Sequence, residues 1–95
     1  MPAHLTLPSR LDSSSAPDLL ACLRPQIGQP LVLDASGVEV IGALAIEVLV
    51  AAGRQWLSDG LTLQVVTPSP AFVATCATLG LCPTAPWRLA EEAAA

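Results

Sequence analysis

The sequence predicts an α/β fold, because segments with the apolar pattern of strands alternate three times with segments that have the pattern of helices. At 95 residues the chain has the length of one small domain. Hydrophobic residues make up 53% of it and charged residues 13%, a composition typical of chains that fold around a core. Consecutive strand, helix and strand segments usually form right-handed crossovers between parallel strands. We therefore expect a single domain, residues 1–95, with helices packed on a sheet.

The N-terminal part of the chain is predicted to form a strand and then a helix. In residues 3–11 leucines alternate with other residues, and Pro8 marks the end of the strand. Ser15 is expected to cap the helix, because Asp18 stands three residues later, like the acid of a capping box. A proline and a glycine place the end of this helix near residues 24–27. Its apolar face is predicted to consist of Leu19, Leu20, Leu23 and Ile27.

The middle of the chain is predicted to form a central strand and the longest helix. Residues 31–33 are all apolar, as in a central strand, and Asp34 closes the run. Residues 35–37 have turn chemistry. The helix is expected to open at about Ala43 and to end at residues 58–60. Its inward face is predicted to contain Leu44, Ala45, Val48, Leu49, Ala52 and Trp56, and its outward stripe Ala43, Glu47, Val50, Arg54 and Ser58.

The C-terminal part is predicted to form a strand, a helix and a tail. Residues 61–66 alternate as a strand does. Ser69 is expected to cap a helix that begins at Pro70 and stops at Gly80. Residues 83–95 are predicted to form a proline-bounded loop with an anchoring tryptophan, followed by a short helix. The inward residues of the capped helix are predicted to be Phe72, Val73, Cys76 and Leu79.

Charge and hydropathy exclude several classes of function. The net charge is −4, from eight acidic residues against four arginines, and the chain contains no lysine. A protein that binds nucleic acid needs a basic face, so nucleic acid is not an expected partner. The longest apolar run, residues 40–53, contains Glu47 and is too short to cross a bilayer. Since the N-terminus also lacks the pattern of a secretory signal, we expect a cytoplasmic protein without direct membrane insertion.

Neither a metal site nor a catalytic centre is expected. Cys22, Cys76 and Cys82 have no CxxC spacing and stand among apolar neighbours, so they are interpreted as buried, reduced thiols. His4 is the only histidine, which disfavours a Cys/His metal site or a Cys–His nucleophile pair. The acidic residues form no spaced pair for acid/base catalysis, and no glycine-rich phosphate loop is present. We therefore expect no enzymatic activity, no metal and no cofactor.

Three sequence segments, taken in order, resemble a known domain family. They are LVLDASGVEVIG followed by an apolar helix, DGLTLQVVTPSPAF, and LGL. Together they are similar to the STAS domain, the fold of bacterial anti-sigma factor antagonists and of the cytoplasmic tails of sulfate transporters, over residues 5–82. The resemblance implies a small mixed β-sheet of about four strands covered by about four α-helices. Many STAS domains open with a hairpin, whereas this chain has room for one clear strand before its first helix.

The resemblance also draws attention to the entrance of the helix at Ala43. In the family, an Asp-Ser-Ser-Gly segment at this place carries a serine that a partner kinase phosphorylates. The matching residues here are Gly42, Ala43, Leu44 and Ala45, none of which has a hydroxyl group. Leu44, with its neighbour Ala43, is therefore interpreted as a degenerate phosphosite, and the phosphorylation switch of the family is not expected.

An apolar helix entrance without a phosphoacceptor suits docking against another protein, since interface cores are apolar and depleted in charge. The alternative for Leu44 and Val50 is an ordinary place in the core. The alternative for Glu47 and Arg54 is that they are separately solvated, since they are seven residues apart and an i,i+4 ion pair cannot join them. The candidate partner-binding residues are Ser36, Gly37, Gly42, Ala43, Leu44, Glu47, Val50 and Arg54.

Three functions are compatible with these residues. The first is a non-enzymatic regulatory protein that binds a protein partner in bacterial signalling, such as an anti-sigma factor kinase or a chemotaxis-associated protein. The second is the cytoplasmic STAS subunit of an ABC-type phospholipid transport complex. The third is a domain that binds a small ligand or nucleotide, which the lack of a basic or glycine-rich cradle disfavours. A homodimer formed through a sheet edge or the apolar helix stripe is a further option.

Overall fold

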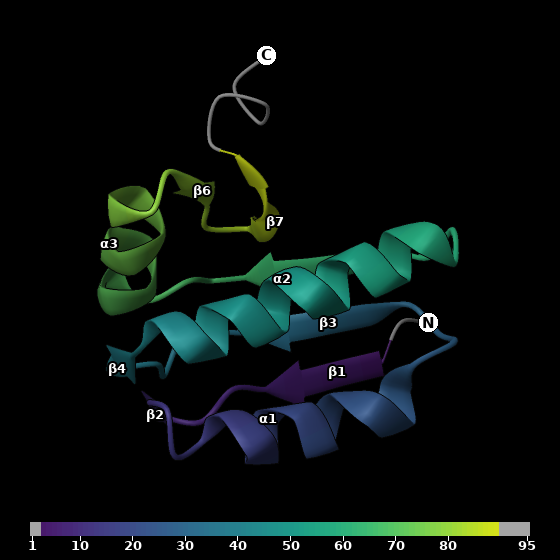
Figure 1. The fold of residues 1–95 in the computed structure, drawn as a ribbon, viewed down its shortest axis with the longest axis horizontal. Helices are drawn as coiled ribbons and strands as arrows, with labels where there is room; N and C mark the ends of the chain where they lie inside the picture. The colour runs from purple at the N-terminus through teal and green to yellow at the C-terminus, as the bar shows by residue number, and fades with distance from the viewer. Residues whose placement is uncertain (1–2, 90–95) are drawn as a thin grey trace.

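The computed structural model of the protein describes residues 3–89 (Figure 1). Within this range it contains three α-helices, α1 (Ala16–Leu23), α2 (Ala43–Ser58) and α3 (Pro70–Thr78), and the short 3-10 helix η1 (Arg24–Gln26). The strands are β1 (Ala3–Thr6), β2 (Arg10–Leu11), β3 (Leu31–Asp34), β4 (Val40–Ile41), β5 (Leu63–Val66), β6 (Leu81–Cys82) and β7 (Ala85–Leu89). Parallel and antiparallel strands both occur, so the predicted mixed α/β class is confirmed.

Three parallel strands form the main sheet in the order β1-β3-β5. Because a helix follows each of the first two strands and the order advances in one direction, right-handed crossovers place α1 and α2 on the same face. Figure 1 shows these two helices running side by side along the sheet. The rows in register across the sheet include Ala3, Leu31 and Leu63, and two residues further on Leu5, Leu33 and Val65.

The two faces of this sheet differ in their cover. Leu31, Leu33 and Val65 alternate with more exposed neighbours and are buried beneath the helices. On the other face His4 and Gln64 are exposed, and they lie in the same row of the register, on either side of Val32. Parallel sheets are usually covered by helices on both faces, whereas α1 and α2 cover this sheet on one face.

Strands β2 and β4 form a second parallel pair outside the main sheet. Arg10 lies opposite Val40, and Leu11 lies opposite Ile41. Gly42, the residue before α2, donates its N–H to the carbonyl oxygen of Leu11 at 2.8 Å. The segment that leads into α1 is thereby tied to the segment that leads into α2.

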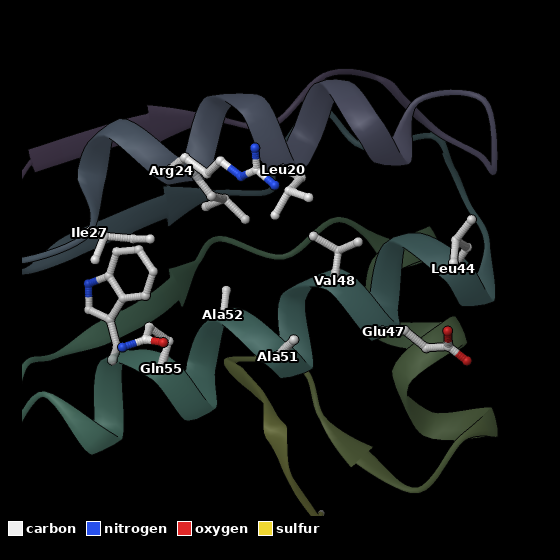
Figure 2. Close-up of a pocket in the computed structure, with 11 residues that line it drawn as sticks. Leu20, Arg24, Ile27, Leu44, Glu47, Val48, Ala51, Ala52 and Gln55 are labelled. Carbon is white, nitrogen blue, oxygen red and sulfur yellow. The ribbon is translucent and has the colours of Figure 1, made fainter.

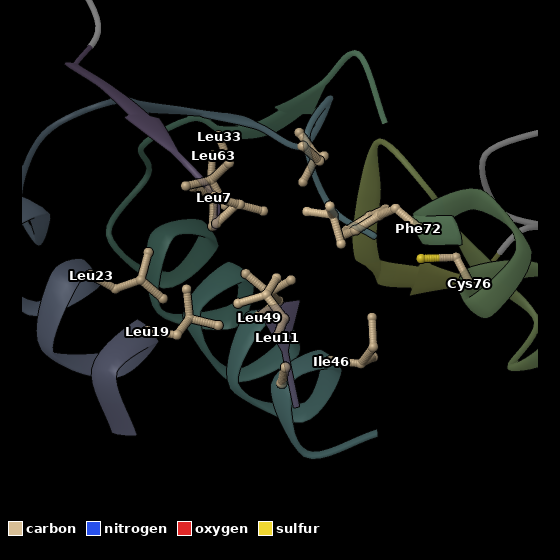
Figure 3. Close-up of a cluster of buried hydrophobic side chains, with 14 of the residues drawn as sticks. Leu7, Leu11, Leu19, Leu23, Leu33, Ile46, Leu49, Leu63, Phe72 and Cys76 are labelled. Atoms are coloured by element: carbon tan, nitrogen blue, oxygen red, sulfur yellow. The ribbon is translucent and has the colours of Figure 1, made fainter. Parts of the chain in front are cut away.

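One apolar cluster joins the helices to the sheet (Figure 3). Helix α3 contributes Phe72 and Cys76, which are fully buried. Both were predicted to point inward, whereas Val73 and Leu79, predicted on the same face, are 39% and 47% exposed. The buried members of the cluster are Leu7, Leu11, Leu19, Leu23, Leu31, Leu33, Ala35, Val38, Ala45, Ile46, Leu49, Trp56, Leu63, Val65, Phe72 and Cys76.

The two predicted serine caps have different outcomes. Ser69 caps α3 as predicted, since its Oγ accepts the N–H of Phe72 at 3.2 Å and donates to the carbonyl oxygen of Val38. Ser15 stands at the N-cap of α1, but its side chain makes no capping hydrogen bond, so that expectation is wrong. Its hydroxyl donates instead to Asp12 Oδ1 at 3.1 Å, and the same oxygen accepts the backbone N–H of Ser15. Asp12 competes for the serine side chain because it organises the turn before the helix.

Several expectations about the strands are corrected by the structure. The single strand predicted within residues 3–11 is two strands, β1 and β2, on either side of Pro8. About four strands in one sheet were expected, whereas seven short strands form three separate sheets in the described residues. The fourth helix is also missing from residues 83–89, which contain β7, paired antiparallel with β6. The rest of that predicted helix, residues 90–95, lies outside the described residues.

Strand β7 is held against α2 by a close approach that only glycine permits. A Cβ atom added to Gly53 would overlap the ring atoms Cγ, Cδ2 and Cε3 of Trp87. Glycine within a helix usually costs about 0.5–1 kcal/mol of stability relative to alanine. Here it leaves the space that the Trp87 ring occupies. The hairpin is also tied to the sheet, since the N–H of Val65 donates to the carbonyl oxygen of Thr84 at 3.0 Å. Trp87 thus anchors the tail as predicted, but on a strand instead of a loop.

We expect Gly53→Ala to lower the free energy of unfolding by roughly 1–3 kcal/mol, because the new methyl group overpacks against Trp87. In a Trp87→Ala background the same change should instead stabilise the protein by about 1 kcal/mol, since alanine is the better helix former once the ring is gone. Urea unfolding of the four proteins in this cycle measures both effects. A stabilising Gly53→Ala change in the parent protein would show that the ring and the helix do not touch.

The three cysteines occupy different environments. Cys76 is fully buried, whereas Cys22 is exposed and Cys82 is partly exposed, so the prediction that all three are buried is correct only for Cys76. Burial, together with the nearby Cys82, raises the pKa of the Cys76 thiol from 9.0 to about 11. The hydroxyl of Thr84, 3.3 Å from the sulfur of Cys82, lowers the pKa of that thiol. None of the three is in a disulfide.

We expect the free energy of unfolding to fall as the pH rises from about 9 to about 11. In this interval the unfolded chain loses a proton from Cys76 that the folded chain keeps, so ionisation favours unfolding. The chain has no lysine or tyrosine to mask this effect, and Cys82, whose thiol pKa is lowered, opposes it only near the lower end of the interval. Urea unfolding at pH 8.5, 9.5 and 10.5 measures it, and Cys76→Ala should flatten the dependence. An unchanged slope in that variant would contradict the assignment.

Candidate functional site

Helix α2 presents one face to the core and the other to solvent. Ala45, Ile46, Leu49 and Trp56 are buried. The inward face predicted from the sequence is therefore rotated by about one residue, because Leu44, expected to point inward, is 45% exposed while Ile46 is buried. Strand β7, which was not predicted, packs against this helix.

Four exposed residues at steps of three or four form a line along the outer surface of α2, which we call the α2 ridge. They are Ala43, Glu47, Ala51 and Arg54. Three of the four belong to the outward stripe predicted from the sequence, and Ala51 is an addition. An apolar hollow lies on each side of this ridge.

The hollow between α1 and α2, named here the α1–α2 groove, has a volume of about 420 Å³ (Figure 2). Leu20 and Ile27 were predicted to face the core, but they are 40% and 50% exposed and border this groove. Helix α1 has only eight residues, and Ala16, Leu19 and Leu23 already fill its buried side. The lining residues are Leu20, Leu23, Arg24, Ile27, Leu44, Glu47, Val48, Ala51, Ala52, Gln55 and Trp56.

The hollow on the other side of the ridge, named here the α2–α3 groove, has a volume of about 390 Å³. It brings together four of the predicted partner-binding residues. Val50 is half-buried and packs against the core, so its interpretation as a core residue holds in part, and it also lines this groove. The lining residues are Ala43, Ile46, Glu47, Val50, Ala51, Arg54, Leu79 and Leu81.

The remaining predicted residues are distributed differently. Leu44 lines the α1–α2 groove, and Gly42 is the half-buried N-cap residue of α2. Ser36 and Gly37 are exposed in the turn between β3 and β4 and line neither groove. In that turn the N–H of Ser36 donates to Asp34 at 2.9 Å, which holds the pKa of this carboxyl below its usual value. The turn therefore has a local structural role that accounts for its residues.

The entrance of α2 is accessible and has no hydroxyl group. Ala43 and Leu44 are both exposed in the first turn of the helix. Gly42 caps the helix without a side-chain hydrogen bond. The family's phosphoacceptor would therefore lie at the surface here, but the side chains at this place cannot accept a phosphate.

The charges beside the grooves are not neutralised by neighbouring side chains. In the described part of the chain the one ion pair joins Arg10 to Asp12 at 3.3 Å, on the exposed turn before α1. Glu47 and Arg54 therefore carry separate charges on the α2 ridge, as one of the two sequence interpretations proposed. The pKa of Asp12 is lowered, first by the hydroxyl of Ser14. That carboxylate thus organises its turn and lies outside both grooves.

Sequence reasoning missed the α1–α2 groove. Leu20 and Ile27 were assigned to the core because they continue the apolar spacing of α1, and a periodic pattern does not reveal where a short helix leaves its neighbour uncovered. Among residues 3–89, no helix is long and apolar enough to cross a membrane. No group of three or more His, Cys, Asp or Glu side chains in the same range is arranged to hold a metal ion.

Comparison with known proteins identifies the family. A family model described as "Mlab, STAS domain" matches residues 2–82, which include all three helices and the main sheet. Neither the curated proteins nor the solved structures contain a match to the chain. The chain belongs to the STAS domain family, whose members are in general regulatory and resemble anti-sigma factor antagonists.

Proposed function

We propose that this STAS domain is a non-enzymatic module that binds a partner protein through the α2 ridge and the α2–α3 groove. The observation that carries the proposal is the exposed line of Ala43, Glu47, Ala51 and Arg54 beside an apolar hollow of about 390 Å³. Apolar surface that a core does not use, bordered by a few charges, is typical of a protein interface.

The chemistry of the helix entrance supports a partner that stays bound without a phosphorylation signal. Phosphorylation adds close to two negative charges, which repel acidic neighbours or attract basic ones. The side chains of Ala43 and Leu44 have no hydroxyl group that a kinase could phosphorylate. Binding at the ridge is then controlled by the concentrations and affinities of the two proteins, without a covalent switch at this position.

Two kinds of partner fit this proposal. The first is a bacterial signalling protein, such as an anti-sigma factor kinase or a chemotaxis-associated protein. The second is the ATPase of an ABC-type phospholipid transport complex, in which this chain would be the STAS subunit. The absence of a side-chain hydroxyl group from positions 42–45 supports the second candidate, because a permanent subunit of a complex needs no signal for release.

We expect Ala51→Arg to weaken partner binding at least tenfold, because a long charged side chain would stand in the middle of the ridge and beside both grooves. Ala51 is exposed within a helix and arginine is a good helix former, so the free energy of unfolding should change by less than about 0.5 kcal/mol. Gln64→Arg, on the exposed face of the sheet, is the matched control.

The measurement is co-purification of each tagged protein from the native cells, followed by titration of the recovered partner. A kinase or chemotaxis protein among the partners supports the signalling role, and an ATPase supports the transport role. Loss of binding in Gln64→Arg but not in Ala51→Arg would move the interface to the sheet. Recovery of no protein partner by the parent chain would contradict the proposal itself.

A further inference from the structure

The α1–α2 groove has the size and the lining of a small-molecule site. Its volume of about 420 Å³ lies within the range of roughly 300–1,000 Å³ typical of ligand pockets. Eight of its eleven lining residues are apolar, and the two helices contribute from opposite sides. Figure 2 shows Leu20 on the α1 side and Val48 and Ala52 on the α2 side facing the space between the helices.

The bottom of the groove is apolar, and the one polar side-chain atom of Trp56 there already has a hydrogen-bond partner. Trp56 is 2% exposed, and its indole N–H donates to the carbonyl oxygen of Gln29 at 2.8 Å. The ring is thus fixed in place, and its only polar atom needs nothing from a ligand. Leu23 is buried beside it and Ala52 is half-buried, so the groove floor offers only apolar surface.

The depth of the groove favours an extended chain over a folded helix as its occupant. Leu20, Ile27 and Leu44 are exposed at the rim, whereas Leu23 and Trp56 are buried. A helix with its side chains is roughly 10–12 Å across, so it would rest on the rim. An alkyl chain is thin enough to reach the floor. From Leu44 to Gln55, the groove follows α2 for about 16 Å at the helical rise of 1.5 Å per residue.

The polar groups of the groove select the charge of the occupant. Gln55 donates its amide N–H groups to the carboxylate of Asp59 at 3.1 and 3.2 Å, so that side chain is already engaged. Arg24 is exposed at the rim and has no ion-pair partner among the described residues. In Figure 2 its guanidinium group extends along the α1 side of the groove toward Leu20. Glu47 lies at the other end, beside Leu44, and repels an anion there.

We propose that the α1–α2 groove binds a single-chain amphiphile, with the alkyl chain along Leu20, Val48 and Ala52 and an anionic head group at Arg24. The head group is a carboxylate or a phosphate ester, since both accept hydrogen bonds from a guanidinium group. This site is distinct from the α2–α3 groove assigned to a partner protein, although Glu47 and Ala51 border both. Its existence does not depend on the proposed function.

The test uses the fluorescence of Trp56, which lies in the groove floor. The chain has two tryptophans, so Trp87→Phe leaves Trp56 as the only emitter. The probes are octanoate, decanoate and dodecanoate, dodecyl phosphate, and dodecyltrimethylammonium as the cationic comparison, each below its critical micelle concentration. Retention of cooperative urea unfolding confirms that each variant is folded.

We expect a saturable change in Trp56 emission with the anionic probes, and tighter binding as the chain lengthens, by up to about fourfold per methylene group. Arg24→Gln should weaken binding of dodecanoate at least tenfold and bring it close to that of the cationic probe. Ala52→Leu should weaken the binding of every probe at least tenfold, because the larger side chain fills the floor of the groove. Arg88→Gln, which removes an equal charge from β7 outside the groove, should change nothing.

The comparison of dodecanoate with dodecyl phosphate identifies the head group. The probe that binds more tightly shows whether the natural ligand carries a carboxylate or a phosphate ester. Three results would overturn the proposal. They are the absence of saturable binding by either anionic probe, unchanged affinity in Ala52→Leu, and equal affinity of the parent protein for the cationic and anionic dodecyl probes. Failure of these experiments leaves partner binding at the α2 ridge unaffected, because co-purification measures the binding of the partner protein directly.

Discussion

The need to cover one face of a parallel sheet decides how α2 is oriented. Leu33 and Val65 of neighbouring strands are fully buried only because side chains from the crossover helices lie over them. Ile46 and Leu49 supply part of this cover, so residues on the opposite side of the helix must face solvent. The α2 ridge is a direct result of that arrangement. The same requirement leaves the two hollows, since a helix packed on a sheet cannot also fill the space on both of its flanks.

The two grooves share part of their walls, and this has a thermodynamic consequence. Glu47 and Ala51 border both hollows, so a protein in one and an amphiphile in the other would contact the same side chains. If each occupant alters the position of these residues, each changes the affinity of the other by the same factor. A STAS domain without a phosphoacceptor would then still have a means of regulation, through a ligand instead of a covalent modification.

Local signals in the sequence were sufficient to predict much of this fold. The start of α2 at Ala43 and the cap at Ser69 depend on turn chemistry and hydrogen bonds between near neighbours, and both were predicted. The line from Ala43 to Arg54 followed from helical periodicity. Strand β7 could not be predicted, because it depends on a contact between Trp87 and Gly53, which are distant in the sequence. The α1–α2 groove was missed for a similar reason, since it arises from the packing of two helices and not from the pattern of either one.

The second strand of the hairpin, which lies beyond residue 82, matters for anyone who wishes to produce this domain. The family match ends at residue 82, yet β7 extends to Leu89 and places Trp87 on α2. A protein cut at the end of the match would lose that ring and the carbonyl group of Thr84 that receives the Val65 N–H. The outer edge of β5 would then offer unpaired backbone groups to other chains, which is a known route to aggregation. The boundaries of the packed unit are therefore wider than those by which its family is identified.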